Sequence, residues 1–186
     1  FVRPECRQYQ LALLRQVLER YPDLAGLHLE EPGHPTCHCA YCAKLAKEWL
    51  GLDILADPAG TEASLRNLAA FMNGDFFARL RQMANSLRPE IWLSANGSAG
   101  ANPDWNIARD WPTWLKRGYI DFYVPQVYTE DPTRFTKLAR ETQDVLGGGA
   151  MVTGMAVSWT GIYPRRQDAQ NLVQEIRSAR QLGAKG

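Results

Sequence analysis

Several features are absent from this 186-residue sequence, and each absence narrows the class of protein. No apolar run approaches the roughly 20 residues that a membrane-spanning helix needs. The formal net charge is only +1 and no block of basic residues occurs, so nothing favours a nucleic-acid or membrane partner. The composition is otherwise that of an ordinary globular protein, and the length suits one domain, predicted to span residues 1–186.

The sequence has no evident internal repeat, and it begins with Phe1 rather than methionine. We therefore expect a piece of a longer protein, which leaves the cellular compartment open. Tryptophan, by contrast, is frequent, with six residues. Aromatic rings of this kind pack in cores and also stack on the faces of sugar rings.

Apolar periodicity and Pro/Gly punctuation predict alternating helices and strands. The predicted helices span residues 4–21, 40–50, 61–87, 105–117, 132–146 and 165–182, and the predicted strands span 24–30, 91–95, 119–128 and 150–159. Residues 51–60 are expected to form a linker, and residues 96–104 a flexible loop outside the core.

Strands that alternate with helices indicate a parallel sheet in an α/β fold. Four such strands are half of a (β/α)8 barrel, for which about 250 residues is typical. We therefore predict the C-terminal half of a TIM barrel. A complete open sheet of the flavodoxin type is the alternative. No glycine-rich phosphate loop follows any of the predicted strands, which argues against it.

Two adjacent carboxylates, Glu30 and Glu31, end the first predicted strand. Alternation along the strand places Glu30 on the polar face, towards the barrel mouth, where such barrels have their active sites. A carboxylic acid in a partly buried mouth can donate a proton. Glu30 is therefore the predicted general acid/base, with Glu31 assisting or orienting. The alternative interpretation is that both residues only cap a loop or form ion pairs.

The second carboxyl group that glycoside hydrolysis requires is not evident in the sequence. The fourth predicted strand contains no acid, and the other acids near strand ends, Asp104, Glu130 and Asp131, suit helix caps or solvated positions better.

Polar and aromatic residues near the strand ends are candidates for substrate contact: Asn96, Gln126, Tyr128 and Trp159. A satisfied core amide is the alternative role of Gln126, and rim packing that of Trp159. His28 is expected to face the interior as a hydrogen-bonded core histidine.

Three cysteines, Cys37, Cys39 and Cys42, have a C-x-C-x-x-C spacing that indicates a metal site. A closed zinc site needs four ligands, and Cys6 is the obvious fourth, with His34 or His38 as substitutes. Such a site would act as scaffold rather than as catalyst. Free buried thiols are the alternative.

The stretch from Asp110 to Tyr128, DWPTWLKRGYIDFYVPQVY, resembles a signature of the glycosyl hydrolase-like 10 group of TIM barrels. That pattern consists of D-W-x-x-W, G-x-x-D and P-Q-x-Y, matched here by Asp110, Trp111, Trp114, Gly118, Asp121, Pro125, Gln126 and Tyr128. The segment AGLHLEEP is similar to the D-G-I-H-hydrophobic-D-D segment of the same family, with glutamates at positions 30 and 31 and alanine at position 25.

A strand-end acid followed by C-x-C-x-x-C is similar to family 42 β-galactosidases. There, an upstream cysteine and the triplet hold zinc, and the strand-end glutamate is the acid/base. The resemblance implies zinc ligation by the four cysteines of this chain and catalysis by Glu30 or Glu31. Leu29 occupies the position of that family's asparagine, and the strand expected to carry the nucleophile reads AVSW, which departs from a standard retaining mechanism.

The function expected from these observations is hydrolysis of O-glycosidic bonds in an oligo- or polysaccharide by carboxylate general acid/base catalysis. The expected partners are a carbohydrate substrate and the remainder of the barrel, and the expected cofactor is a structural zinc ion. A non-catalytic carbohydrate-binding barrel is the competing hypothesis, favoured by the missing acid on the fourth strand. A zinc or redox protein whose cysteines are the function is the third.

Overall fold

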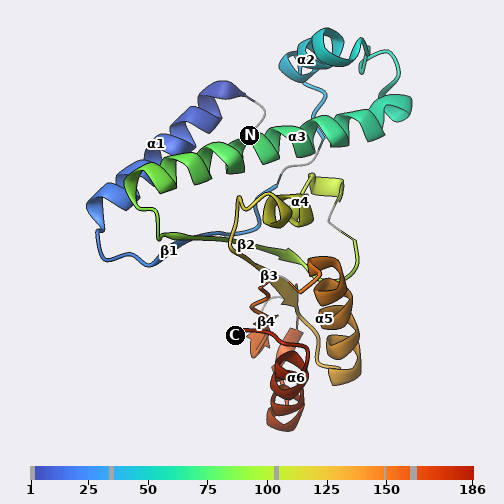
Figure 1. Cartoon of the computed structure of the whole chain (residues 1–186). Helices are drawn as coiled ribbons and strands as arrows, with labels where there is room; N and C mark the ends of the chain where they lie inside the picture. Colours follow the sequence, from blue (N-terminus) through green and yellow to red (C-terminus); the bar gives the residue numbers. More distant parts are fainter. Residues whose placement is uncertain (1–2, 34–35, 103–104, 149, 160–162) are drawn as a thin grey trace.

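The computed structural model describes residues 3–33, 36–102, 105–148, 150–159 and 163–186. Six α-helices and four consecutive parallel strands account for most of this part of the chain (Figure 1). The helices are α1 (Pro4–Arg20), α2 (Ala40–Leu50), α3 (Pro58–Leu87), α4 (Trp111–Lys116), α5 (Pro132–Leu146) and α6 (Ala169–Gln181). The strands are β1 (Gly26–Leu29), β2 (Trp92–Ser98), β3 (Phe122–Val127), β4 (Gly154–Met155), β5 (Ser158–Trp159) and β6 (Tyr163–Arg166), and a short 3-10 helix, η1, spans Trp105–Ile107. None of the described helices is both long and apolar enough to cross a membrane.

The central sheet has the order β1-β2-β3-β4, and every neighbouring pair is parallel. Helices α3, α4 and α5 pack on the outer face of this sheet, α1 lies alongside α3, and α2 packs on α3 away from the sheet (Figure 1). The fold is therefore a partial (β/α) barrel, which confirms the predicted half-barrel. Beyond β4, Lys185 donates its backbone N–H to Met151 and Gly186 accepts one from Thr153, so residues 185–186 run where the next barrel strand would lie.

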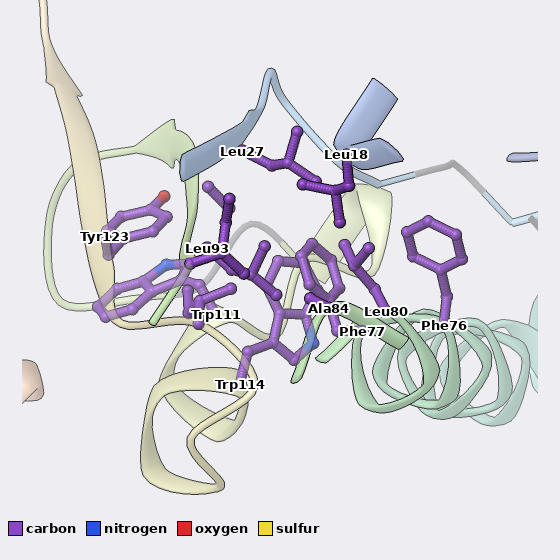
Figure 2. Packing of buried hydrophobic residues seen from close by; sticks show 13 residues of the cluster. Leu18, Leu27, Phe76, Phe77, Leu80, Ala84, Leu93, Trp111, Trp114 and Tyr123 are labelled. Carbon is purple, nitrogen blue, oxygen red and sulfur yellow. The ribbon is translucent and has the colours of Figure 1, made fainter. Parts of the chain in front are cut away.

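The main hydrophobic core fills the space between the outer face of the sheet and helices α1, α3 and α4. Figure 2 shows Leu27, Leu93 and Tyr123, one from each of the first three strands, directed towards this core. Two stacked aromatic pairs close it, Phe77 with Trp114 at 4.1 Å between ring centroids and Trp111 with Tyr123 at 4.3 Å. The two tryptophans of the D-W-x-x-W segment are thus fully buried core residues.

Local sequence signals set the helix starts. An aspartate N-cap accepts a backbone N–H from the first turn of α3, α4, α5 and α6, namely Asp57, Asp110, Asp131 and Asp168. Such caps satisfy backbone donors that otherwise lack partners at a helix start. In the first three of these helices a proline also occupies the first turn, where its missing N–H costs nothing.

Several predicted boundaries were wrong. Residues 96–98 belong to β2 rather than to a loop, because they pair with β3. The linker prediction for residues 51–60 missed the start of α3 at Pro58 and the complete burial of Ile54. The fourth strand is much shorter than 150–159, since residues 158–159 pair antiparallel with β6 instead. The last helix accordingly begins at Ala169, after its Asp168 cap.

Candidate functional site

The candidate site lies on the inner face of the sheet, at the carboxyl ends of β1, β2 and β3. The register pairs His28 with Ser94 and Ser94 with Phe122, so residues 28, 94 and 122 share one level of the inner face. Residue 30 follows β1 by one position and lies beside Asn96. Side chains separated by 66 or more residues in sequence therefore meet at one edge of the sheet.

Glu30 is the focus of these contacts. Asn96 donates its Nδ2 to Glu30 Oε2 at 2.6 Å, and Gln126 Nε2 lies 3.5 Å from Oε1. His28 Nε2 lies 3.8 Å from Oε2, and the other ring nitrogen, Nδ1, is hydrogen-bonded with Ser94 Oγ at 2.9 Å. The Glu30 side chain is 71% exposed. Its carboxylate is therefore held by two amide groups and remains accessible to a ligand.

Glu31 differs from Glu30 in backbone conformation. It adopts a left-handed φ of 41°, an uncommon conformation for a residue other than glycine. Its backbone N–H donates to Asn96 Oδ1, so one buried asparagine binds both glutamates through opposite ends of its amide. The pKa of the Tyr128 hydroxyl is raised, first by burial and then by the negative charges of Glu30 and Glu31.

The loop that follows the two glutamates is supported by a residue that sequence reasoning missed. Arg109 is 3% exposed and donates its Nε to the carbonyl oxygen of Pro32. Its side chain passes over Gly97, where a Cβ atom would lie 2.4 Å from Nη1. A glycine directly after Asn96 was the available signal, because glycine within a strand often marks a close approach.

The other residues named from sequence have different placements. Asp131 caps α5 by accepting the backbone N–H of Thr133, which is the helix-cap role that the sequence favoured over catalysis. No acid lies in β4. Asp121, part of the G-x-x-D segment, lies at the opposite end of the strands, where it accepts hydrogen bonds from Arg81 and from the backbone N–H of Leu93. Asp104 and His34 lie outside the described residues, and Trp159 belongs to β5 with its side chain outside the description.

The cysteine triplet forms a second cluster, at the start of α2. The sulfur atoms of Cys37, Cys39 and Cys42 all lie within 4.8 Å of one another, so the three residues can bind one metal ion. Cys39 is the N-cap of α2 and Cys42 lies in its first turn. The backbone of Cys42 is the main cause that lowers the pKa of the Cys39 thiol to about 7, whereas burial raises that of Cys42 to about 12.

A fourth ligand is not part of this cluster within the described residues. Cys6 is exposed on the first turn of α1. The Arg3 guanidinium lies over the Tyr41 ring, 5.4 Å from its centroid, which places the start of α1 next to the first turn of α2. Glu62 of α3 binds the cysteine loop from the other side, through Thr36 Oγ1 at 2.7 Å and beside His38 Nε2 at 3.9 Å.

The two clusters offer different chemistry. The cluster around Glu30 presents an open carboxylate near the amides of Asn96 and Gln126, the His28 imidazole and the Tyr128 phenol. This arrangement suits proton transfer to a polar ligand. The cysteine cluster supplies soft sulfur ligands at the spacing of a structural metal site. No family model and no curated protein matches this chain.

Proposed function

We propose that this chain forms half of a carbohydrate-active barrel in which Glu30 is the general acid/base for hydrolysis of O-glycosidic bonds. The observation that carries the proposal is the position of Glu30 at the carboxyl end of β1, where Asn96 and Gln126 of the two following strands approach its carboxylate. Active sites of parallel barrels lie at this end of the strands. A carboxylate that is held in place but open to solvent is suited to protonate a leaving oxygen.

The neighbouring residues have separate roles in this proposal. Asn96 holds the carboxylate in one orientation through its 2.6 Å hydrogen bond. Gln126 and Tyr128 bind substrate hydroxyl groups, since Gln126 lies beside Glu30 and Tyr128 directly follows β3 at the same edge of the sheet. Trp159 serves as a stacking platform for a sugar ring. Glu31 orients the site.

The second carboxyl group is Glu31, a loop acid, or an acid from strands outside the four described here. Four strands cannot close a barrel that needs eight. The inner face also leaves Trp92 62% exposed against Phe122, as expected of a face that the other barrel strands cover. The remainder of the barrel is therefore the proposed partner of this chain.

The proposed metal is zinc, held by Cys37, Cys39 and Cys42 with Cys6 as the fourth ligand. Three thiol groups within 4.8 Å of one another fit a sulfur metal site. The contact of Arg3 with Tyr41 brings the start of α1, which carries Cys6, next to the first turn of α2 and supports Cys6 as the fourth ligand. Zinc would join the helix before β1 to the loop after it. Its role is structural, because the site lies on α2, which packs on the N-terminal half of α3 away from the sheet (Figure 1).

The test is Glu30→Gln in the protein that carries the complete barrel, with Glu130→Gln as a matched control at an exposed acid after β3. We expect Glu30→Gln to slow cleavage of natural oligosaccharides by about 10²–10⁴-fold, as for loss of a general acid. Aryl glycosides with strongly acidic leaving groups need no protonation, so their cleavage should suffer far less. Unchanged turnover on oligosaccharides would remove Glu30 from the mechanism.

A non-catalytic carbohydrate-binding barrel is the second candidate, and the lack of an acid in β4 favours it. Calorimetric titration with oligosaccharides, together with chromatography of the same mixtures, separates the two. Binding without products in the protein that carries the complete barrel would support this second function.

A further inference from the structure

We infer that Cys39 and Cys42 form a reversible disulfide and that its formation releases the metal ion of the cysteine cluster. The metal part of this inference rests on the proposed metal site, whereas the disulfide part rests only on the arrangement of the two thiols. Neither part depends on glycoside hydrolysis.

The first observation is the geometry of the two residues. Their sulfur atoms are 3.6 Å apart, and a disulfide bond is about 2.0 Å long, so a small side-chain rotation joins them. Cys39 is the N-cap of α2 and Cys42 the third residue of the helix. Side chains at these two positions face each other across the first turn, as in a capping box. The start of α2 therefore sets the spacing of the pair.

The second observation is the different accessibility of the two thiols. Cys39 is exposed, and Cys42 is buried against Ala46, Ile54 and Leu65. An external reagent therefore reaches Cys39 first, and Cys42 is placed to react with the product from inside. C-x-x-C pairs with an outer and an inner cysteine at a helix start are suited to thiol–disulfide exchange.

The reaction needs a small-molecule disulfide, such as oxidised glutathione, as the oxidant. The Cys39 sulfur attacks one sulfur of the oxidant, forms a mixed disulfide and expels one glutathione thiolate. The Cys42 sulfur then attacks the Cys39 sulfur, forms the intramolecular bond and expels the second glutathione thiolate. The two cysteine sulfurs, which are thiolates while they bind the metal, lose two electrons to the oxidant, and the two expelled glutathione thiolates take up two protons from solvent.

Metal release follows because a disulfide sulfur is a poor metal ligand compared with a thiolate. Oxidation removes two of the three clustered ligands and leaves only Cys37. A site with so few ligands does not hold zinc, which needs four for a closed structural site. The contacts of Glu62 with Thr36 and His38 do not involve sulfur, so the loop keeps its attachment to α3 when the metal leaves.

The experiment incubates the zinc-loaded protein with oxidised glutathione and follows zinc with a chromogenic chelator. The protein is then denatured and one portion is weighed, while the rest is alkylated and digested with trypsin, which releases residues 21–44 as one peptide with all three clustered cysteines. We expect one zinc ion released per chain, a mass loss of about 2 Da before alkylation, and alkylation of Cys37 alone in that peptide. Dithiothreitol should restore both the thiols and the metal binding.

Two variants assign the pair. Cys42→Ser should stop at a mixed disulfide with glutathione on Cys39, and Cys37→Ser should still form the Cys39–Cys42 bond. A disulfide that joins Cys37 to either partner, or thiols that stay reduced throughout, would overturn the inference. A Cys39–Cys42 disulfide in a protein that never binds zinc would overturn the metal release alone. Glycan cleavage by the Glu30 variants is measured separately and does not bear on these outcomes.

Discussion

Replacing Asn96 by alanine removes two hydrogen bonds that join β2 to the end of β1. The amide donates to Glu30 Oε2 at 2.6 Å and accepts the backbone N–H of Glu31. A hydrogen bond to a charged group contributes about 1.5–3 kcal/mol, and one between neutral groups about 0.5–1.5 kcal/mol. The Glu30 side chain is 71% exposed, so water replaces the lost donor and the lower values apply. We expect the free energy of unfolding to fall by about 2 kcal/mol.

Two further variants divide this effect. Asn96→Asp keeps the acceptor for the Glu31 N–H but places a second carboxylate beside Glu30, so we expect it to destabilise more than alanine at neutral pH and less in acid. Gln126→Ala is the matched control, because its amide lies 3.5 Å from Glu30 at the exposed end of the site. Its cost should stay below about 0.5 kcal/mol.

The assay is urea denaturation followed by circular dichroism, with a double-mutant cycle between Asn96→Ala and Glu30→Ala. Residues in direct contact couple by about 0.5–3 kcal/mol, and we expect a coupling of about 1 kcal/mol here. A cycle that closes to zero, or an Asn96→Ala cost equal to that of Gln126→Ala, would refute the contact and with it the proposed orientation of Glu30.

Four further perturbations test other parts of the structure. Gly97→Ala places a Cβ 2.4 Å from Arg109 Nη1 and should cost about 1–3 kcal/mol in denaturation. A Cβ added at Gly74 of α3 meets nothing within 4 Å, so Gly74→Ala should stabilise the protein by about 0.5–1 kcal/mol. Equal effects of the two glycine substitutions would contradict the packing of Arg109 against Gly97. Burial raises the pKa of the Glu175 carboxyl above 4.5, so the folded state retains this proton longer and stability falls as the pH rises from 4.5 through the raised pKa. Glu175→Gln should flatten the stability curve in that window, and an unchanged slope would exclude this origin. Chelation should lower the thermal unfolding midpoint of the zinc-loaded protein but leave the midpoint of the Cys37→Ser variant unchanged. Equal shifts of the two midpoints in calorimetry would argue against the metal site.

The order of the elements and the half-barrel were predictable because their signals are local. Residues 40–50 and 132–146 were predicted as helices with the bounds that the structure has. Asp131 with Pro132 starts the second of these helices, and Gly147 ends it in a left-handed conformation with φ 57°. These signals act within a few residues, so the sequence pattern is enough to read them.

The parts that were missed depend on distant residues. The Asn-Gly-Ser run at 96–98 has the composition of a turn, but pairing with residues 124–126 of β3 makes it a strand. Residues 158–159 pair antiparallel with Tyr163–Arg166 rather than extending β4.

The candidate site was likewise predictable where residue positions follow from local sequence, and not where they depend on distant contacts. Alternation along β1 placed Glu30 on the inner face, and the strand-end positions of Asn96 and Gln126 placed them nearby. The left-handed backbone of Glu31 and the contact of Arg109 with Pro32 were not predictable, since both arise from packing between segments far apart in sequence.

The long helix α3 has a consequence for how the contacts between β2 and the end of β1 form during folding. The contacts of His28 with Ser94 and of Glu30 with Asn96 each join residues 66 positions apart, and the 30 residues of α3 lie within that loop. Contacts of such high contact order are slow to form, because the loop entropy is lost before the pairing is gained. A preformed α3 shortens the distance to be closed, since a helix rises only about 1.5 Å per residue. Backbone amides of β1 should therefore gain protection from hydrogen exchange later in folding than those of α3.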